Sequence, residues 1–454
     1  MDGNLARRQQ ADLLEPSTSP LHLQRVDAAL DEGLRPALRI CILSYRGNPA
    51  SGGQGVYVSN LSRELAAQGH QVTVLSGPPY PDLAADVRLE RIPGLDLFNG
   101  QDKLKAFRWS WLLSPLALRE WASAMLGGFM EPWSYGHRAW HWLRTRLDDF
   151  DVVHDNQSLC TTLLPMQKRI PLVTTIHHPI TKDRELELRF ARSWMRRVLI
   201  RRWYSFLPMQ QKIAPKLKHI ITPSDSSRHD LVSSFGISLD RATVTPLGVD
   251  HSVFRPIAGT ERIPFRIMTV TSADVPLKGL DTLLQAVAVI KRQKQAFAQD
   301  VELVVVGRPR RGGHTLRMIE ELNLEDAVHF VAADRGPIQI AETYATASVA
   351  VIPSLYEGFG LPAVEAMASG VPLVGTRAGA LPEVIGEAGI MVPPEHPESM
   401  AAAIVEILRS QTLQARYRRE GLRRAHEIYN WEQTAALTVQ LYRKAIDESA
   451  GAAA

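Results

Sequence analysis

The chain has 454 residues, a hydrophobic content of 45% and a charged content of 22%, which predict a soluble globular protein of two or three domains. Its net charge of +4 is too small to indicate a nucleic-acid partner. The two cysteines, Cys41 and Cys160, argue against a disulfide scaffold and favour a cytoplasmic location. Residues 1–36 are polar and lack the apolar core of a signal peptide, and no window of about 20 apolar residues predicts a transmembrane helix.

A βαβ unit follows this polar extension. We predict a strand over Arg39–Ser44, a helix over Val56–Ala67 and a second strand over Gln71–Ser76. The turn between the first strand and the helix contains Gly53 and Gly55. Ligands of α/β sheets bind at such turns, where glycines let backbone N–H groups approach a phosphate. A lone Gly-Gly-x-Gly is usually only a turn, but its position here favours phosphate binding.

Further strands of the first half are predicted at residues 151–154 and 171–176, and the half closes with His219-Ile-Ile-Thr-Pro223. The strand at 171–176 is followed directly by His177 and His178. Two imidazoles at the carboxyl end of a strand fit contact with a ligand, and they also fit a structural role in which one caps the strand and the other faces solvent.

A second strand–helix series occupies the rest of the chain. We predict strands at residues 265–271, 301–306, 328–331, 348–352 and 372–375, with helices near 279–292 and 316–322. From about residue 397 to Ala445 the pattern is helical. Alternation of strands and helices in both halves predicts two doubly wound parallel sheets, with the ligand site in the cleft between them.

Glu357 and Glu365 flank a Gly-Phe-Gly-Leu-Pro turn that leads from a buried strand into a short helix. The N–H groups of Phe359, Gly360 and Leu361 are predicted to face an anion at the start of this helix. Glu365 is placed on the first helical turn, where a carboxylate accepts hydrogen bonds from vicinal hydroxyls. A helix-capping glutamate in an unrelated α/β domain is the simpler alternative, but it does not account for the whole run.

This run resembles the signature of glycosyltransferase family 4, in which seven residues separate two glutamates. The resemblance implies that Glu357 contacts the donor sugar and that Glu365 contacts the nucleotide ribose. It also implies that Gly53 and Gly55 face the diphosphate, and that His177 contacts the primary hydroxyl of the sugar.

The resemblance covers most of residues 38–446 and implies the GT-B architecture, with two Rossmann-like domains facing each other across a cleft. The expected domains are an acceptor-side domain at residues 37–250 and a nucleotide-sugar domain at 251–425. Residues 426–454, which include Trp431, are expected to cross back to the first domain as a helix. Family members are retaining, and the implied co-substrate is a nucleoside diphosphate sugar, with neither a metal nor another cofactor.

The sequence departs from the family at the diphosphate clamp. The family pairs an arginine with a lysine there; Lys278 is present, but alignment on it places Ala273 at the arginine position. Lysine alone lacks the bidentate geometry of arginine. The run Arg308-Pro-Arg310-Arg311 follows a strand of the same half and either supplies the missing charge or forms a solvated basic loop.

Two stretches of the first half have an unusual composition that bears on the kind of acceptor. Residues 107–142 hold six of the nine tryptophans, and residues 189–218 carry nine Lys or Arg and no acid. Arg189, Arg192 and Arg196 fall on one helical face and Phe190, Trp194 and Val198 on another. These features fit contact with an anionic membrane and a lipid-linked acceptor. They fit equally a helical subdomain whose core contains the tryptophans.

The sequence therefore predicts a cytoplasmic, retaining hexosyltransferase in which Glu357, His177 and Lys278 carry the chemistry. A synthase of a soluble glycoside or disaccharide is one alternative. A catalytically weak sugar-nucleotide-binding protein, suggested by Ala273, is another. A dinucleotide oxidoreductase does not fit, because the first turn lacks the Gly-x-Gly-x-x-Gly fingerprint.

Overall fold

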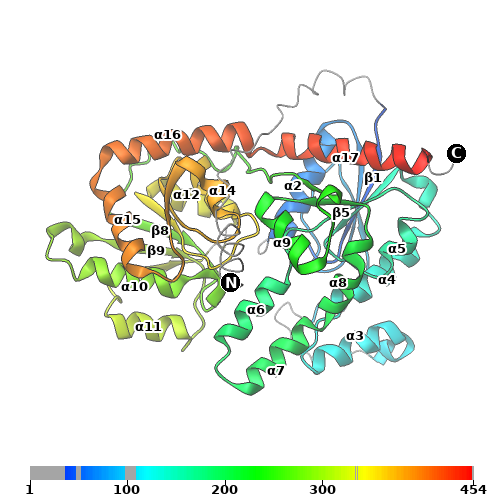
Figure 1. The fold of residues 1–454 in the computed structure, drawn as a ribbon, viewed down its shortest axis with the longest axis horizontal. Helices are drawn as coiled ribbons and strands as arrows, with labels where there is room; N and C mark the ends of the chain where they lie inside the picture. Colours follow the sequence, from blue (N-terminus) through cyan, green and yellow to red (C-terminus); the bar gives the residue numbers. More distant parts are fainter. Residues whose placement is uncertain (1–35, 48–52, 98–108, 333, 335, 452–454) are drawn as a thin grey trace, which may run out of the picture. The chain divides into compact units, whose positions relative to one another are not determined.

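The computed structural model describes residues 36–47, 53–97, 109–332, 334 and 336–451, and residues 36–454 form one compact unit. This unit contains two parallel β-sheets, each surrounded by helices (Figure 1). The strands of the first sheet are β1 Arg39–Ser44, β2 Gln71–Ser76, β3 Arg88–Arg91, β4 Val152–Asn156, β5 Leu172–Thr175, β6 His219–Thr222 and β7 Ala242–Val244. Their order across the sheet is β3-β2-β1-β4-β5-β6-β7.

The second sheet has the order β10-β9-β8-β11-β12-β13. Its strands are β8 Arg266–Val270, β9 Glu302–Val306, β10 Val328–Val331, β11 Val349–Ile352, β12 Leu373–Thr376 and β13 Gly389–Val392. In both sheets the strand order reverses beside the first strand, between β1 and β4 and between β8 and β11. Such switch points lie where α/β sheets bind ligands, at the carboxyl ends of the strands. The predicted fold class, two doubly wound parallel sheets, is confirmed.

Helices connect the strands of both sheets. Those of the first half are α2 Gly53–Ala67, α3 Pro115–Met125, α4 Glu131–Leu143, α5 Leu163–Met166, α6 Thr181–Phe190, α7 Trp194–Trp203, α8 Leu207–Ile213 and α9 Asp225–Phe235. Those of the second half are α10 Leu280–Lys291, α11 His314–Leu322, α12 Pro337–Thr346, α13 Leu361–Ala368, α14 Leu381–Ile385 and α15 Pro397–Arg409. Because helices cover both faces, the central strands are buried throughout, as β4 and β11 show.

The last two helices divide between the halves, as predicted. The helix α16 (Gln411–Ile428) packs against α13, whereas α17 (Trp431–Gly451) packs against α2 and β5 of the first half. At this crossing Gly248 lies so close to the main chain of Trp431 that a Cβ atom would overlap it. Trp431 is buried in a hydrophobic cluster with members in both sheets, including Val152 and Met268.

Two details of the sequence prediction are wrong. The helix α2 begins at Gly53 rather than at Val56, so Gly53 and Gly55 belong to its first turn rather than to the loop before it. The helix α13 begins at Leu361, because Gly360 adopts a left-handed conformation (φ +98°) that ends the preceding loop. Glu365 is therefore the fifth residue of α13 and lies beyond its first turn. Residues 48–52 of the predicted glycine turn lie outside the described residues.

Candidate active site

The loops after β8 and β11, the two strands at the switch point of the second sheet, lie against each other. The amide of Leu355 donates to the carbonyl of Leu277 over 2.8 Å. Gly279 has φ +66°, and a Cβ atom there would overlap the carbonyl oxygen of Pro353. This close packing brings Lys278 to Glu357, with 2.8 Å between Nζ and Oε1. The structure thus unites two residues that are 79 positions apart in the chain.

The carboxylate of Glu357 is anchored on one side only. Its Oε1 accepts hydrogen bonds from Lys278 Nζ and from Ser354 Oγ, the latter over 2.7 Å. Among the described residues, Oε2 has no hydrogen-bond partner. One oxygen is therefore held in place while the other is available to accept a hydrogen bond from a ligand hydroxyl.

Lys278 keeps its positive charge. Burial lowers the pKa of its ammonium, but the carboxylate of Glu357 outweighs this effect, and the pKa is raised overall. A fixed cation at this position can stabilise negative charge that develops on a departing group.

The amides at the start of α13 are available to an anion. Within the described part of the chain, the N–H groups of Phe359, Gly360 and Leu361 donate to no other residue. A Cβ built on Gly53, the first residue of α2, would lie 3.8 Å from Leu361 Cδ1. The start of α2 therefore lies beside the start of α13, which supports phosphate binding between two positive helix ends.

Glu365 lies one turn further along α13. Burial raises the pKa of its carboxyl to about 7. Among the described residues, none forms a hydrogen bond or a salt bridge with its carboxylate, so it is free to bind hydroxyl groups.

His177 lies just after β5 with its ring held on two sides. Its Nε2 is 2.8 Å from Asn156 Oδ1, its amide donates to Gln157 Oε1 over 2.9 Å, and its ring meets that of Tyr57 edge-on at 4.8 Å. Burial lowers its pKa to about 3, so the ring is neutral. Because Asn156 Oδ1 is an acceptor, the ring proton is on Nε2, which leaves Nδ1 to accept a hydrogen bond from a hydroxyl group.

His178, unlike His177, lies near the charged side chains of Asp183 and Glu357. Its Nε2 is 3.1 Å from Asp183 Oδ2. Burial lowers the pKa of the imidazole, but Asp183 and Glu357 outweigh this effect and raise it overall. A Cβ on Gly358 would lie only 2.7 Å from His178 Cβ, so the His177–His178 segment rests on the Glu357 loop.

Ala273 and the basic run near Arg308 lie in adjacent loops. Ala273 is buried in the core of the second half. Asp274 links the loops by accepting hydrogen bonds from the amides of Arg310 (2.8 Å) and Thr315 (2.9 Å). The Arg308 side chain is exposed and pairs with Asp334. The basic run thus lies next to Ala273, the position at which the sequence departs from the family. Its role in binding the diphosphate stays a prediction.

Sequence reasoning missed several residues of this site. Ser354, Asn156 and Asp183 hold Glu357, His177 and His178, respectively. Each is an isolated polar residue without a motif; the only signal was that Ser354 and Asn156 lie at or just after the ends of buried strands. Outside the gaps in the described chain, no group of three His, Cys, Asp or Glu is arranged to hold a metal ion. No helix among the described residues is long and apolar enough to cross a membrane.

Comparison with known proteins places this geometry in a family. Residues 51–253 match the model described as Glycosyltransferase Family 4, and residues 264–410 match Glycosyl transferases group 1. The chain is 45% identical to MMP alpha-(1→4)-mannosyltransferase of Mycolicibacterium hassiacum, an alignment that covers 90% of this chain and 98% of that protein.

Two further similarities are more distant. D-inositol 3-phosphate glycosyltransferase of Kineococcus radiotolerans is 26% identical, with 91% of this chain and 96% of that protein covered. The solved structure of sucrose-phosphate synthase from Thermosynechococcus elongatus superposes with a TM-score of 0.68 at 23% identity, covering 89% of this chain and 98% of that one. With its two sheets, its crossing helix and these relatives, the chain belongs to glycosyltransferase family 4 and is a glycosyltransferase of the GT-B fold.

Proposed function

We propose that this enzyme transfers mannose from a nucleoside diphosphate sugar to a hydroxyl of a sugar acceptor, with retention of configuration. The observation that carries the proposal is the 45% identity to a relative named as an alpha-(1→4)-mannosyltransferase, over 98% of its length. The relatives named for D-inositol 3-phosphate are only 25–30% identical, so we do not infer their acceptor. An α-linked product made from an α-linked sugar nucleotide corresponds to net retention.

The geometry supports a specific place for the donor. The diphosphate lies between Gly53 and Gly55 of α2 and the amides of Phe359, Gly360 and Leu361, with Lys278 as the fixed cation. The free Oε2 of Glu357 and the Nδ1 of His177 accept hydrogen bonds from the mannose hydroxyls. Glu365 accepts hydrogen bonds from the ribose.

The reaction breaks the bond between the anomeric carbon and the phosphate oxygen and forms a bond to the acceptor oxygen. Charge grows on the departing diphosphate, where Lys278 and the α13 amides are already oriented to stabilise it. The acceptor approaches from the same face and its proton passes to the departing phosphate oxygen. Glu357 thus orients the sugar, and no separate base, metal or other cofactor is required. Activity unchanged by EDTA would support the metal-independent step, and its loss would contradict that step.

A transfer assay tests the donor and the acceptor together. The purified enzyme is incubated with GDP-, UDP-, ADP- or dTDP-activated sugars, using methyl α-mannoside as acceptor and D-inositol 3-phosphate as the alternative. We expect release of nucleoside diphosphate only with a mannose donor and the mannoside, and an α linkage in the product by NMR. Faster transfer of another sugar, or preference for the inositol phosphate, would overturn the proposal, and a β linkage would overturn retention.

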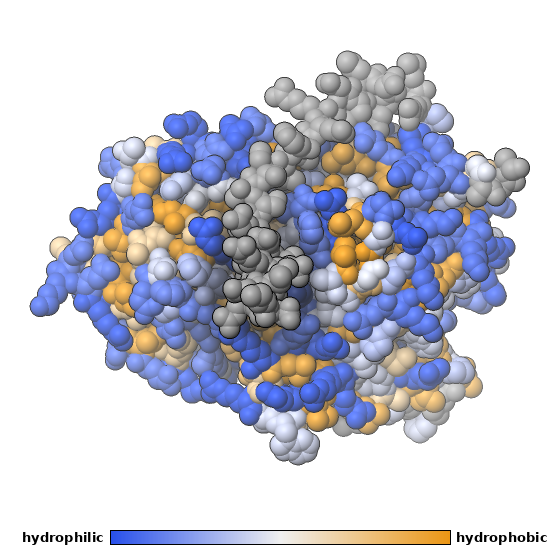
Figure 2. All heavy atoms as spheres, in the orientation of Figure 1, coloured by the Kyte–Doolittle hydropathy of each residue, from blue (hydrophilic) through white to orange (hydrophobic). Residues whose placement is uncertain are grey.

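We further propose that the enzyme is cytoplasmic and binds an anionic membrane surface through α7. Trp194, Met195 and Leu199 in this helix are 75%, 58% and 51% exposed. Leu199 Cδ2 lies 3.4 Å from a Cβ built on Gly127, which joins α7 to the exposed apolar end of α3. Figure 2 shows hydrophobic residues bordered by hydrophilic ones at the lower edge of the molecule, over α6 and α7.

The charge on α7 favours lipid over a second copy of the chain. Arg196, Arg197, Arg201 and Arg202 are all exposed. Among the described residues of the basic stretch, only Arg189 forms a salt bridge, with Glu395. The tryptophans of residues 109–142 are less informative, because all except Trp109 are half-buried.

Vesicle sedimentation separates the membrane-bound enzyme from the soluble glycoside synthase. At low salt we expect pelleting with phosphatidylglycerol vesicles, weakened at least about fivefold in Arg196→Glu, because each basic residue contributes about 1 kcal/mol. Arg419→Glu, the same change in charge on exposed α16, is the matched control and should pellet like the wild type. Equal behaviour of both variants, or no pelleting of the wild type, would favour the soluble alternative.

Nucleotide binding without any turnover would favour the weak sugar-nucleotide-binding protein.

A further inference from the structure

The main-chain carbonyl of Gly358, the residue after Glu357, is held by the other half of the molecule. Ser224 Oγ and Ser227 Oγ each donate a hydrogen bond of 2.8 Å to it. Both serines are fully buried at the start of α9, where Ser224 is the N-cap and its Oγ accepts from the Ser227 amide over 3.0 Å. The loop that carries Glu357 is thus bonded directly to the first half.

A carboxylate of the second half completes this junction. Glu383 in α14 accepts hydrogen bonds from the amides of Asp225 (3.0 Å) and Ser226 (3.2 Å). These are the first two amides of α9, which have no partner inside the helix and lie at the positive end of its dipole. Tyr356 Oη adds a hydrogen bond of 2.8 Å to Asp230 on the same helix.

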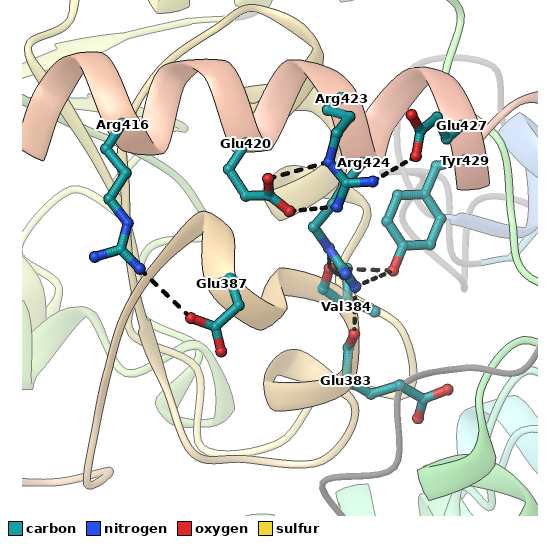
Figure 3. Close-up of polar contacts among 9 residues, drawn as sticks. All are labelled: Glu383, Val384, Glu387, Arg416, Glu420, Arg423, Arg424, Glu427 and Tyr429. Atoms are coloured by element: carbon teal, nitrogen blue, oxygen red, sulfur yellow. Dashed lines mark hydrogen bonds and ion pairs between the residues drawn. The ribbon is translucent and has the colours of Figure 1, made fainter.

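The position of Glu383 is itself fixed by the C-terminal helices. Figure 3 shows that Arg424 reaches from α16 to the carbonyl of Glu383 (2.9 Å) and that the Tyr429 hydroxyl donates to the carbonyl of Val384 (3.1 Å). In the same view the Glu383 side chain points away from α16. The main chain of α14 is therefore held on one side while its carboxylate caps α9 on the other.

Holding the Gly358 carbonyl also orients the next amide. The Gly358–Phe359 peptide bond is trans, so its C=O and N–H point in opposite directions. Bonding of the carbonyl to α9 therefore turns the Phe359 N–H away from α9, and this N–H has no acceptor among the described residues. It is one of the three amides assigned above to the donor diphosphate.

We propose that Ser224 and Ser227 are positioning residues that aim the Phe359 amide at the donor diphosphate. The phosphate site is then complete only while α9 is docked on the Glu357 loop. Glu383 holds α9 there through its hydrogen bonds to the first amides of the helix. This inference rests on the proposed function, because it presumes that a nucleoside diphosphate binds at the start of α13. Ser224 and Ser227 belong to the first half of the chain, and in this proposal they act on the site without contacting the donor or the acceptor.

Ser227→Ala is the informative variant. It removes one bond to Gly358 but leaves the N-cap of α9, because Ser224 Oγ still accepts from the amide of residue 227. Ser233→Ala is the control on the same helix; its exposed hydroxyl bonds only to the carbonyl of Asp230. Dissociation constants are measured by calorimetry for GDP, UDP, ADP and dTDP and for the corresponding monophosphates, without sugar or acceptor.

We expect Ser227→Ala to weaken the preferred nucleoside diphosphate about tenfold while leaving its monophosphate unchanged, because one oriented hydrogen bond to a charged group is lost. The kcat/KM for transfer should fall by a similar factor, and Ser233→Ala should match the wild type. Equal weakening of both nucleotides would indicate a merely structural role and overturn the inference, as would unchanged binding of both. Failure of the wild type to bind any nucleoside diphosphate would instead overturn the proposed function, and the inference with it.

Discussion

Glu357 has one carboxylate oxygen that is held by other residues and one that is not. Its Oε1 is fixed by Lys278 and Ser354, which holds the side chain in one orientation, and its Oε2 is left to a ligand. The same contacts keep Lys278 charged despite burial. In the proposed function each partner therefore prepares the other for the donor, Glu357 for the sugar and Lys278 for the diphosphate.

Replacing Glu357 should separate turnover from nucleotide binding. In Glu357→Ala the sugar loses an oriented acceptor, while Lys278, whose pKa the carboxylate of Asp183 also raises, is left to the diphosphate. We expect kcat to fall about 100-fold or more, by analogy with removal of one preorganised polar group, whereas affinity for the nucleoside diphosphate is largely kept. Single-turnover kinetics and calorimetry measure the two quantities. Equal loss of both would refute the assigned role of Glu357.

Glu365 predicts a pH dependence of stability. Its pKa is raised to about 7 in the folded chain, whereas an unperturbed glutamate titrates near about 4.3. Between these values the folded state holds a proton that the unfolded state has lost, so the free energy of unfolding falls as the pH rises. Ionisation of the buried carboxyl costs on the order of 3–4 kcal/mol well above pH 7.

Glu365→Gln cannot ionise and removes this contribution. Relative to the wild type, the variant should gain stability between about pH 4 and pH 8. Urea unfolding of both proteins across this range gives the difference directly, and it cancels other buried acids such as Glu131 and Asp155, whose pKa values burial also raises. Parallel stability curves for the two proteins would show that Glu365 does not titrate near pH 7.

At the scale of elements, the site depends on loops that pack closely at the ends of strands. Lys278 reaches Glu357 because the loop after β8 lies against the end of β11, and this contact occurs at Gly279. The residue has φ +66° and no room for a Cβ beside Pro353. Two separate reasons, the backbone conformation and the close approach, thus require glycine at this position.

Gly279→Ala tests this packing. Gly312 provides the matched control, because its φ of +62° is similar but a Cβ there would meet no atom within 4 Å. Gly312→Ala should cost only the left-handed backbone strain, about 1–2 kcal/mol, whereas Gly279→Ala should cost about 3 kcal/mol or more and should weaken nucleotide binding. Chemical denaturation and calorimetry measure both effects, and similar losses in both variants would argue against close packing at Gly279.

The elements that sequence reasoning identified are those with strong hydrophobic runs. The strands β1 and β2 have the predicted bounds, because Arg39–Ser44 and Gln71–Ser76 are rich in Ile, Val and Leu and are buried on both faces after their first residue. Of the four edge strands, β10 was predicted with its bounds, Val328–Val331, whereas β3, β7 and β13 were not predicted. The strand β3, Arg-Leu-Glu-Arg, is half exposed, and β13 begins with a glycine, so neither has the apolar pattern of a central strand.

At the scale of the whole molecule, sequence reasoning named the motif residues of the candidate site but not the contacts that join its two halves. The Gly-Phe-Gly-Leu-Pro turn and Lys278 carry recognisable spacing within one segment. Ser224, Ser227 and Glu383 carry no such spacing, because they act on residues more than 130 positions away in the chain. Contacts of this kind follow from how the halves dock, which no local pattern encodes.

The crossing helix α17 offers a test of how firmly the C-terminus is tied to the first sheet. The Tyr442 hydroxyl lies 2.5 Å from Nδ1 of His154, whose Nε2 is 2.7 Å from Thr175 Oγ1. Burial lowers the pKa of His154 to about 3, so the ring is neutral and depends on both bonds to satisfy its nitrogens. The same Thr175 hydroxyl bonds to Tyr57, which packs against His177.

Tyr442→Phe removes one bond from this buried chain and leaves a nitrogen of His154 unsatisfied. We expect the free energy of unfolding to fall by about 1–3 kcal/mol, the cost of an unpaired buried polar group. Turnover should stay near the wild-type value, because His177 keeps its own hydrogen bond to Asn156. Tyr417→Phe is the control, since the Tyr417 hydroxyl bonds to no described residue and its loss should leave stability nearly unchanged. If the two variants were equally stable, the Tyr442–His154 bond would not be what ties α17 to the first sheet, and packing of α17 against α2 and β5 would have to suffice.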